Sequence, residues 1–536
     1  MSFDPQSTIW LCNVPFDNTY KNVVYFENIT QQRNYFTGKA VKTYENYLIV
    51  RETLPNGGMR SSIKVGENIG VLRALLANYM YWINPNHSNK HFYAFITDFI
   101  YVNENTTKIV FETDVYQTWR FEATLLPSFV VREHSYDDQI GWNLTPEKFD
   151  VQDYEYIKVD DGDAFGVLGT WGYLIGSSAG RSSDELSNAY RGQMMSGIYQ
   201  GVKFFFTEEL NTVNTIIDDI ESNKSDSVLF ITVIPKFCLG NAVMTDGGYV
   251  QGTTAAAQRT FNVNITDNSF DSFVPKNKKL FTSPYFKLMV TNHNGTQAEY
   301  ALEDFKDRQP SFIMRGDISA SPSVVLIPQN YRKSDANWDF GLMLSAFPQC
   351  SFNHDTFKLW LAKNAYTLKT NAVTNATSIA TGAAMMMNPA TAFVGGTIAA
   401  SGAAGIMATI GNVYSQSKEP NKANMGSGNT NLLTAIGQNR FSFYVQKIKQ
   451  HHAKIIDDFF TMYGYQVNEL KTPNTNVRRW FTYTQTIDAN ITGGIPNDDM
   501  AKLKSIYNNG VTQWARDAVI GDYSVDNYCI SEGGNG

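Results

Sequence analysis

The sequence of 536 residues predicts a β-rich, mixed α+β protein of several domains. Three observations lead to this expectation. Phe, Tyr and Trp make up 13% of the residues and, with abundant Val, Ile and Thr, favour strands. Strand-like runs near the N-terminus are joined by a short polar turn. Finally, one segment of 48 residues, 370–417, contains no charged side chain and lies between two stretches with helical spacing.

Residues 1–155 are expected to form a β-rich N-terminal domain. Its clearest element is a hairpin, in which residues 91–102 form one strand, 103–105 form the turn and 108–119 return. Both arms are long for ordinary strands, which suits a sheet shared between subunits. Before the hairpin, residues 67–83 place apolar side chains at helical spacing and predict a helix.

Residues 156–340 give a mixed pattern and are expected to form one or more intermediate domains. Residues 228–235 and 285–292 are strand-like, because they are rich in β-branched and aromatic side chains. Residues 210–222 favour a helix.

The region 341–470 is expected to consist of a helix, an apolar loop and a second helix, followed by a C-terminal segment at 471–536. The first helix is predicted over 355–370, with an acidic residue near its start, and the second over 440–465. The apolar loop, residues 370–417, is therefore an excursion between two helices.

Three interpretations of the apolar loop remain open: a buried helical hairpin, a permanent membrane-spanning domain, or a loop that is exposed only under certain conditions. Pro389 divides the loop, and only the 24 residues of 390–413 are long enough to cross a bilayer. Ala, Gly and Thr favour the bilayer only weakly, and the Gly-rich interior favours a loop over a rigid core element. We therefore prefer the third interpretation.

Composition excludes several classes of protein. The formal net charge of −7 argues against a nucleic-acid coat, which needs a basic surface. The four cysteines are widely separated, so neither a zinc site nor a disulfide framework is expected. The first residues have neither a basic nor an apolar stretch, so we expect no signal peptide, which counts against a secreted pore-forming toxin.

The candidate chemistry is weak. A cell-wall-degrading enzyme is the rival hypothesis, with acids near Glu133 and Asp137 as its candidates, but the cluster 133–138 is better interpreted as a polar turn. His452 and Asp457 are five apart on the predicted helix, a spacing that does not suit metal ligands, so this side is expected to be a solvated face. We expect no catalytic residue, no metal and no cofactor.

Several stretches resemble the distal tail tube, or tail knob, protein of small short-tailed phages of Gram-positive bacteria. They lie at both ends of the chain and cover about a third of it. They read IWLCNVPFDNTYKNVVYF, NKHFYAFITDFIYVNENTTKIVFETDVYQTWRF, VVREHSYDDQIGWNLTPEKFDVQDYEY, DDFFTMYGYQVNELKTPNTNVRRWFTYTQT and IPNDDMAKLKSIYNNGVTQW. Their order, with the apolar loop between them, makes the resemblance specific.

The resemblance implies a structural virion protein at the tail tip, with β-barrel-like tube domains assembled as a ring of six. Its expected partners are further copies of itself, other tail proteins, host membrane lipids and viral DNA passing through the lumen without specific binding. The loop would plug the tube and later penetrate the host membrane. Its expected membrane-contacting residues are Met385, Met386, Met387, Phe393, Val394, Ile398, Ile406, Met407 and Ile410. Flexibility and close packing would come from Gly382, Gly395, Gly396, Gly402 and Gly405.

Overall fold

The computed structural model describes residues 6–351 and 441–531, apart from short gaps. The gaps are residues 54–58, 84, 86–88, 150, 152, 160–170, 182–192, 196–197, 243, 245–247, 251–256, 267, 293–295, 320–321, 337 and 345–348. The chain forms two compact units. Unit 1 comprises Met1–Asp150, Phe273–Leu280 and Gln450–Gly536, and unit 2 comprises Val151–Ser272 and Phe281–Lys449. Both ends of the chain therefore belong to unit 1.

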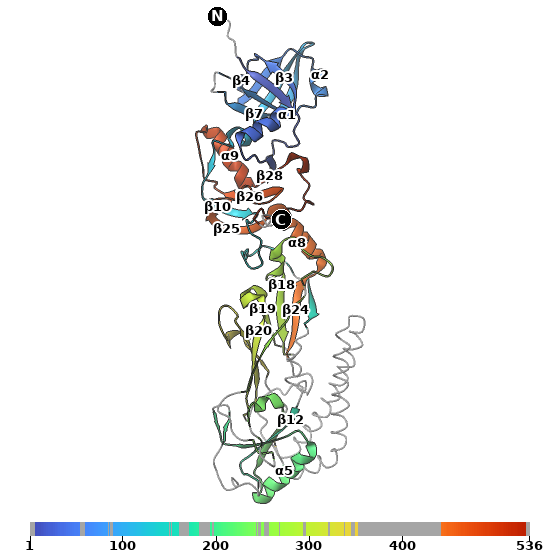
Figure 1. Cartoon of the computed structure of the whole chain (residues 1–536), viewed down its shortest axis with the longest axis vertical. Coiled ribbons are helices and arrows are strands. Elements are labelled where there is room, and N and C mark those ends of the chain that lie inside the picture. The colour runs from blue at the N-terminus through green and yellow to red at the C-terminus, as the bar shows by residue number, and fades with distance from the viewer. Residues whose placement is uncertain are drawn as a thin grey trace. The chain divides into compact units, whose positions relative to one another are not determined.

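The larger sheet of unit 1 has seven antiparallel strands in the order β3-β1-β6-β7-β8-β5-β4. Figure 1 labels β3, β4 and β7 of this sheet. Their bounds are β1 Thr8–Cys12, β3 Ala40–Glu45, β4 Val50–Thr53, β5 Met59–Val65, β6 Tyr79–Ile83, β7 His91–Asn103 and β8 Thr106–Thr113. The predicted hairpin is confirmed as β7 and β8. Its second arm is shorter than expected, because Asp114 ends the strand and caps the helix α3 (Val115–Trp119), accepting a hydrogen bond from the Gln117 amide at 3.1 Å.

Both faces of this sheet are covered. On one face, Met80 and Trp82 pack in a core with the short helix α2 (Ile69–Ala74). On the other, Tyr79 and Tyr81 surround Phe36 of α1 (Ile29–Gly38), whose ring lies 5.1 Å from that of Tyr79. A strand buried on both faces is apolar at every position. The helix predicted over 67–83 is therefore wrong in its second half, which is β6.

The second sheet of unit 1 joins the two ends of the chain. Its strand order is β2-β28-β26-β10-β25, and β2 pairs with β28 in parallel. The bounds are β2 Asn22–Val24, β10 Ser128–Glu133, β25 Tyr465–Lys471, β26 Phe481–Ile487 and β28 Val511–Trp514. The helix α9 (Asn497–Asn509) and α3 share a core with β2 and β28. A small two-stranded sheet pairs β9 Thr124–Leu125, which precedes β10 in the sequence, with β27 Ile491–Thr492, which follows β26.

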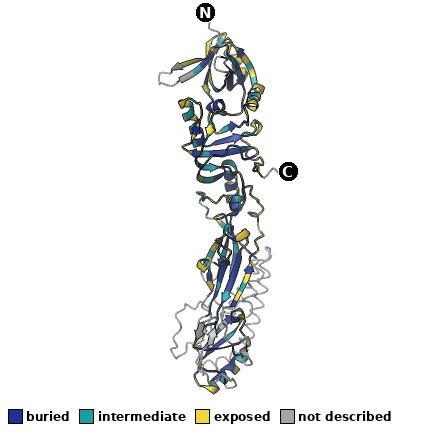
Figure 2. Ribbon diagram, turned by 60° about the vertical axis from the view of Figure 1, so that its left-hand side comes forward, coloured by how far each residue is buried: buried dark blue, intermediate teal, exposed yellow. Residues whose placement is uncertain are grey.

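The described residues of unit 2 form three four-stranded sheets and one two-stranded sheet. Their orders are β11-β24-β18-β19, β15-β12-β16-β23, β17-β20-β21-β22 and β13-β14. The bounds are β11 Tyr154–Lys158, β12 Trp171–Ser177, β13 Gln193–Met195, β14 Ile198–Gln200, β15 Lys203–Thr207, β16 Val228–Pro235, β17 Ala257–Asn262, β18 Phe286–Thr291, β19 Gln297–Ala301, β20 Ser311–Gly316, β21 Val324–Gln329, β22 Leu342–Leu344, β23 Gln349–Ser351 and β24 Ser442–Ile448. Central strands of these sheets are largely buried (Figure 2).

Three predictions in unit 2 are confirmed: β16 over 228–235, β18 within 285–292, and a helix, α5, over Leu210–Asn223. The long helix predicted over 440–465 is wrong in its first half. Residues 442–448 form β24, and only Gln450–Tyr463 form the helix α8. The helix predicted over 355–370 lies outside the described residues. Short 3₁₀ helices are η2 Lys236–Leu239, η3 Lys278–Phe281, η4 Leu302–Asp304, η5 Lys306–Arg308, η6 Trp338–Phe340 and η7 Asp517–Val519.

The sheets of the described residues are open, each with two edge strands. The fold is rich in β-strands, as expected. The expected barrel-like domain is not seen, because the described residues of a single chain form no closed sheet. Closure would need strands from elsewhere, since only a closed sheet removes its edges.

Candidate assembly surface and the polar network behind it

The carboxylate of Glu133, the candidate acid, is buried at the end of β10. Lys471 Nζ donates to it at 2.6 Å, and the backbone amide and side-chain amide of Asn474 donate at 2.8 and 2.9 Å. Burial raises the pKa of Glu133 despite these partners. Both carboxylate oxygens are occupied by protein donors, so this group holds the chain together rather than facing a substrate.

His134 is buried as a neutral imidazole. Its Nδ1 accepts from the backbone amide of Tyr483 at 2.8 Å, so its Nε2 carries the proton and donates to the carbonyl of Thr461 at 3.0 Å. Burial, helped by the nearby Arg478 guanidinium, lowers the pKa of His134 to about 3. The ring thus joins β26 to the helix α8 without carrying charge.

Two further buried carboxylates extend this network. Asp138 accepts from the Tyr465 hydroxyl at 2.6 Å and the Lys278 amide at 3.3 Å. Asp457, on α8, accepts from the amides of Lys276 and Asn277 at 3.1 and 2.9 Å. The network therefore fixes segment 273–280 and the C-terminal part of unit 1 to residues 133–138.

Two expectations about these residues are corrected. The cluster 133–138 is not simply a polar turn, because Glu133, His134 and Asp138 are buried; Asp137 is half-buried. The face of α8 that carries Asp457 is not solvated, because Asp457 is buried, whereas Asp458 is exposed. A fourth carboxylate, Glu147, accepts from Arg132 and from Lys279, the latter at 2.8 Å.

The same sheet carries an exposed apolar stripe, defined as Phe129, Leu470 and Ile487. Phe129 on β10 lies directly opposite Leu470 on β25 and Ile487 on β26. The three residues are 41%, 73% and 59% exposed. Large apolar side chains adjacent on three neighbouring strands form a patch that favours association.

The stripe reaches an open edge of the sheet. Among the described residues, β25 pairs with β10 alone. At the start of β25 the Gln466 amide donates to Glu147 at 2.8 Å and the Val467 carbonyl accepts from Thr145 at 3.4 Å, but no described strand pairs with the other side of the part around Leu470. An edge strand that also exposes a leucine is prone to pairing with another chain unless a natural partner covers it. Sequence reasoning missed this surface; its signal was a large apolar residue at an outward position of each strand.

The predicted loop residues, including Met385–Met387 and Gly395–Gly396, lie outside the described residues. Within the described ranges, no cluster of three or more His, Cys, Asp or Glu side chains could hold a metal ion. No helix in those ranges combines the length and the apolar character needed to span a bilayer.

Comparison with known families places the chain among the tail proteins of tailed phages. Residues 6–124 match the model of the caudoviral major tail protein N-terminus. Residues 252–528, just over half of the chain, match the C-terminal domain of the Bacillus phage phi29 tail knob protein gp9. The chain belongs to this tail knob protein family.

Whole-chain relatives agree with this assignment. The tail knob proteins gp9 of Bacillus phages PZA, B103 and phi29 are 25%, 26% and 24% identical to this chain, and each match covers 96% of it and 97% of the relative. The solved structure of the bacteriophage C1 tail knob protein gp12 shares the fold, with a TM-score of 0.62 at 15% identity, covering 98% of this chain and 100% of that one. The chain is a structural virion protein, not an enzyme.

Proposed function

We propose that this chain assembles into a closed ring of six copies that forms the distal tail tube at the tip of the virion. In this proposal, residues 370–417 plug the tube, leave it on infection and penetrate the host membrane, and viral DNA passes through the lumen. Other tail proteins contact the ring. The apolar stripe carries the assembly part of the proposal, and the charge-free sequence of residues 370–417 carries the membrane part.

The stripe supports assembly because covering it is favourable. Burying a Leu, Ile or Phe side chain contributes about 1.5–3 kcal/mol relative to exposure, so a neighbour that covers the stripe gains several kcal/mol. Cyclic rings repeat one such contact in every subunit, and small gains add around the ring. The open edge at β25 offers backbone pairing in the same place.

The sequence of residues 370–417 supports the membrane step, because it has no charged side chain, the kind that opposes entry into lipid most strongly. The acidic composition supports the passage of DNA. Each copy carries a formal charge of −7, and like charges let DNA slide through without binding.

The assembly part is tested by replacing Leu470 with Glu. Leu76, which is also 73% exposed but lies outside the stripe, provides the matched control L76E. We expect L470E to shift native mass spectra and particle images from rings to monomers, and L76E to leave rings intact. Rings of L470E as stable as those of the natural chain would contradict the role of the stripe.

The membrane part is tested by deleting residues 372–413. We expect the full chain to release dye from liposomes, more strongly at acidic pH, where protonated carboxylates reduce repulsion from an anionic membrane. The deleted chain should still form rings but release no dye. Equal leakage from both chains, or none from the full chain, would refute the loop's role while leaving the assembly part standing.

A further inference from the structure

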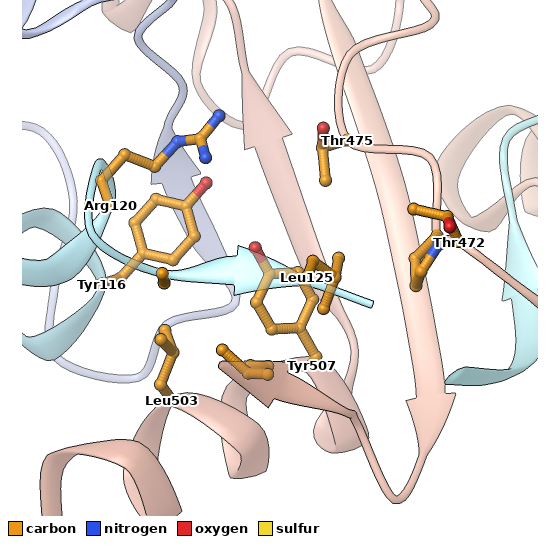
Figure 3. Close-up of a pocket in the computed structure, with 10 residues that line it drawn as sticks. Tyr116, Arg120, Leu125, Thr472, Thr475, Leu503 and Tyr507 are labelled. Atoms are coloured by element: carbon orange, nitrogen blue, oxygen red, sulfur yellow. The ribbon is translucent and has the colours of Figure 1, made fainter. Parts of the chain in front are cut away.

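Unit 1 contains a pocket of about 190 Å³ that the proposed function does not use (Figure 3). Figure 3 shows Arg120 and Tyr116 on one side and Thr472 and Thr475, from the segment after β25, on the other. The complete lining is Tyr116, Arg120, Ala123, Leu125, Thr472, Pro473, Thr475, Ile491, Leu503 and Tyr507.

Arg120 is the one charged residue of this lining. Its guanidinium lies 4.5 Å from the centre of the Tyr25 ring and is hydrogen-bonded to the Tyr25 side chain, whereas its buried Nε has no hydrogen-bond partner among the described residues. Within those residues, no carboxylate lies at ion-pair distance from it. Elsewhere in unit 1 the part-buried Arg132 is paired with Glu147. Arg120 is part-buried as well, and a cation that is partly removed from water without an anion carries a desolvation cost that a bound anion would reduce.

The other residues that line the pocket restrict the chemical class of the anion. Leu125, Ile491 and Leu503 provide apolar surface, while Thr472 and Thr475 lie on the side opposite Arg120 (Figure 3). The Tyr116 hydroxyl already donates to Gln513 Oε1 at 2.9 Å, which fixes that ring. Inorganic phosphate is polar on every side and would leave the apolar surface uncovered. A carboxylate on a short aliphatic stem suits both the Arg120 cation and the apolar residues of the lining.

We propose that this pocket binds a small aliphatic carboxylate, with the Arg120 fork holding the carboxylate and the apolar residues holding the stem. Arginine binds carboxylates through two parallel hydrogen bonds, which matches its position at one end of the pocket. The volume is below that of drug-sized ligand sites, and is suited to a stem of a few carbons. This chemistry is shared by free dicarboxylic acids and by the side chain of a glutamate in a neighbouring polypeptide.

Saturation-transfer NMR and calorimetry on the full chain test the proposal with three probes: glutarate, N-acetyl-glutamate amide, and inorganic phosphate at equal ionic strength. We expect both carboxylates to bind and phosphate to bind at least about tenfold more weakly. Tighter binding of the capped glutamate than of glutarate would assign the site to a protein side chain; the reverse would assign it to a free acid. Absence of carboxylate binding, or equal binding of phosphate, would overturn the proposal.

Two variants, R120Q and A123L, test whether the carboxylate binds in this pocket. R120Q removes the charge and should weaken carboxylate binding at least about tenfold. R479Q is the matched control, because Arg479 also stacks on an aromatic ring, 4.9 Å from that of Trp480, but does not line the pocket. If R120Q fails to fold, A123L keeps Arg120 and fills the pocket, and it should also abolish binding. Unchanged binding in A123L, or in a folded R120Q, would refute the assignment.

Discussion

Replacing Asp457 by alanine tests whether the buried polar network holds unit 1 together. The carboxylate accepts two backbone hydrogen bonds, from Lys276 and Asn277, and D457A would leave both amides without that partner. Asn277 Nδ2 would keep its bonds to the Asp457 carbonyl at 3.0 Å and to Thr461 Oγ1 at 2.8 Å. Asn277 Nδ2 would lose its third bond, to Asp457 Oδ1 at 3.0 Å, but its two remaining bonds offset part of that loss. The main loss is therefore that of the two backbone hydrogen bonds.

The magnitude follows from these two bonds. A hydrogen bond to a charged group contributes about 1.5–3 kcal/mol, so the two together contribute roughly 3–6 kcal/mol. Burial raises the pKa of Asp457, so removing the carboxylate also relieves part of its desolvation cost. We therefore expect D457A to lower the free energy of unfolding of unit 1 by about 3 kcal/mol.

Hydrogen exchange of the full chain measures this effect locally, without assuming that both units unfold together. We expect faster exchange of the Lys276 and Asn277 amides in D457A, and a lower urea midpoint for unit 1. D458A is the matched control, because Asp458 is the exposed neighbour on the same helix. Equal effects of D457A and D458A, or unchanged amide exchange, would refute the reasoning.

Two further predictions concern unit 1. Gly464 has φ +65°, and a Cβ there would lie 2.2 Å from the carbonyl oxygen of Glu133, so G464A should destabilise by about 2–4 kcal/mol in urea unfolding, whereas G494A, with open space around it, should not. Burial raises the pKa of Asp114 to about 6. Between pH 4 and 6 the folded state then holds a proton that the unfolded state has lost, so rising pH costs stability, by at most about 3 kcal/mol. The unfolding free energy of D114N should lack this dependence; a constant difference between natural chain and variant from pH 4 to 7 would contradict it.

Two kinds of element could be predicted from the sequence. One kind has an apolar face and a polar face, and the other has ends marked by neighbouring turn residues. The β7–β8 hairpin has a polar turn between two strand-like runs, and α5 repeats its apolar residues at helical spacing with a solvated face. These signals depend only on neighbours in the sequence. They therefore do not depend on how the rest of the chain folds.

The two failures share one physical cause. β6 and β24 lie inside their sheets, and nearly every residue of each is buried. A strand covered on both faces loses the alternation that distinguishes it from a helix, so spacing alone cannot identify it. In both cases a helix also lies next to the strand in sequence, which extended the apparent helical pattern.

The candidate site was harder to predict from the sequence than the fold was. The stripe exists because Phe129 meets Leu470 and Ile487, more than 300 positions away in the sequence, in one register. The partners of Glu133 are equally distant, at Lys471 and Asn474. Register between remote strands is decided by the assembled core, and no local pattern carries it.

The pairing of β2 with β28 has a consequence for the order of events during synthesis. Residues 22–24 are made long before their parallel partner, residues 511–514. The strands that bear Leu470 and Ile487 also follow residues 370–417 along the chain. We expect that a growing chain cannot display its complete association surface until residues 370–417 have already been made. For the ring proposed above, this order of synthesis would delay closure until residues 370–417 are available to be enclosed.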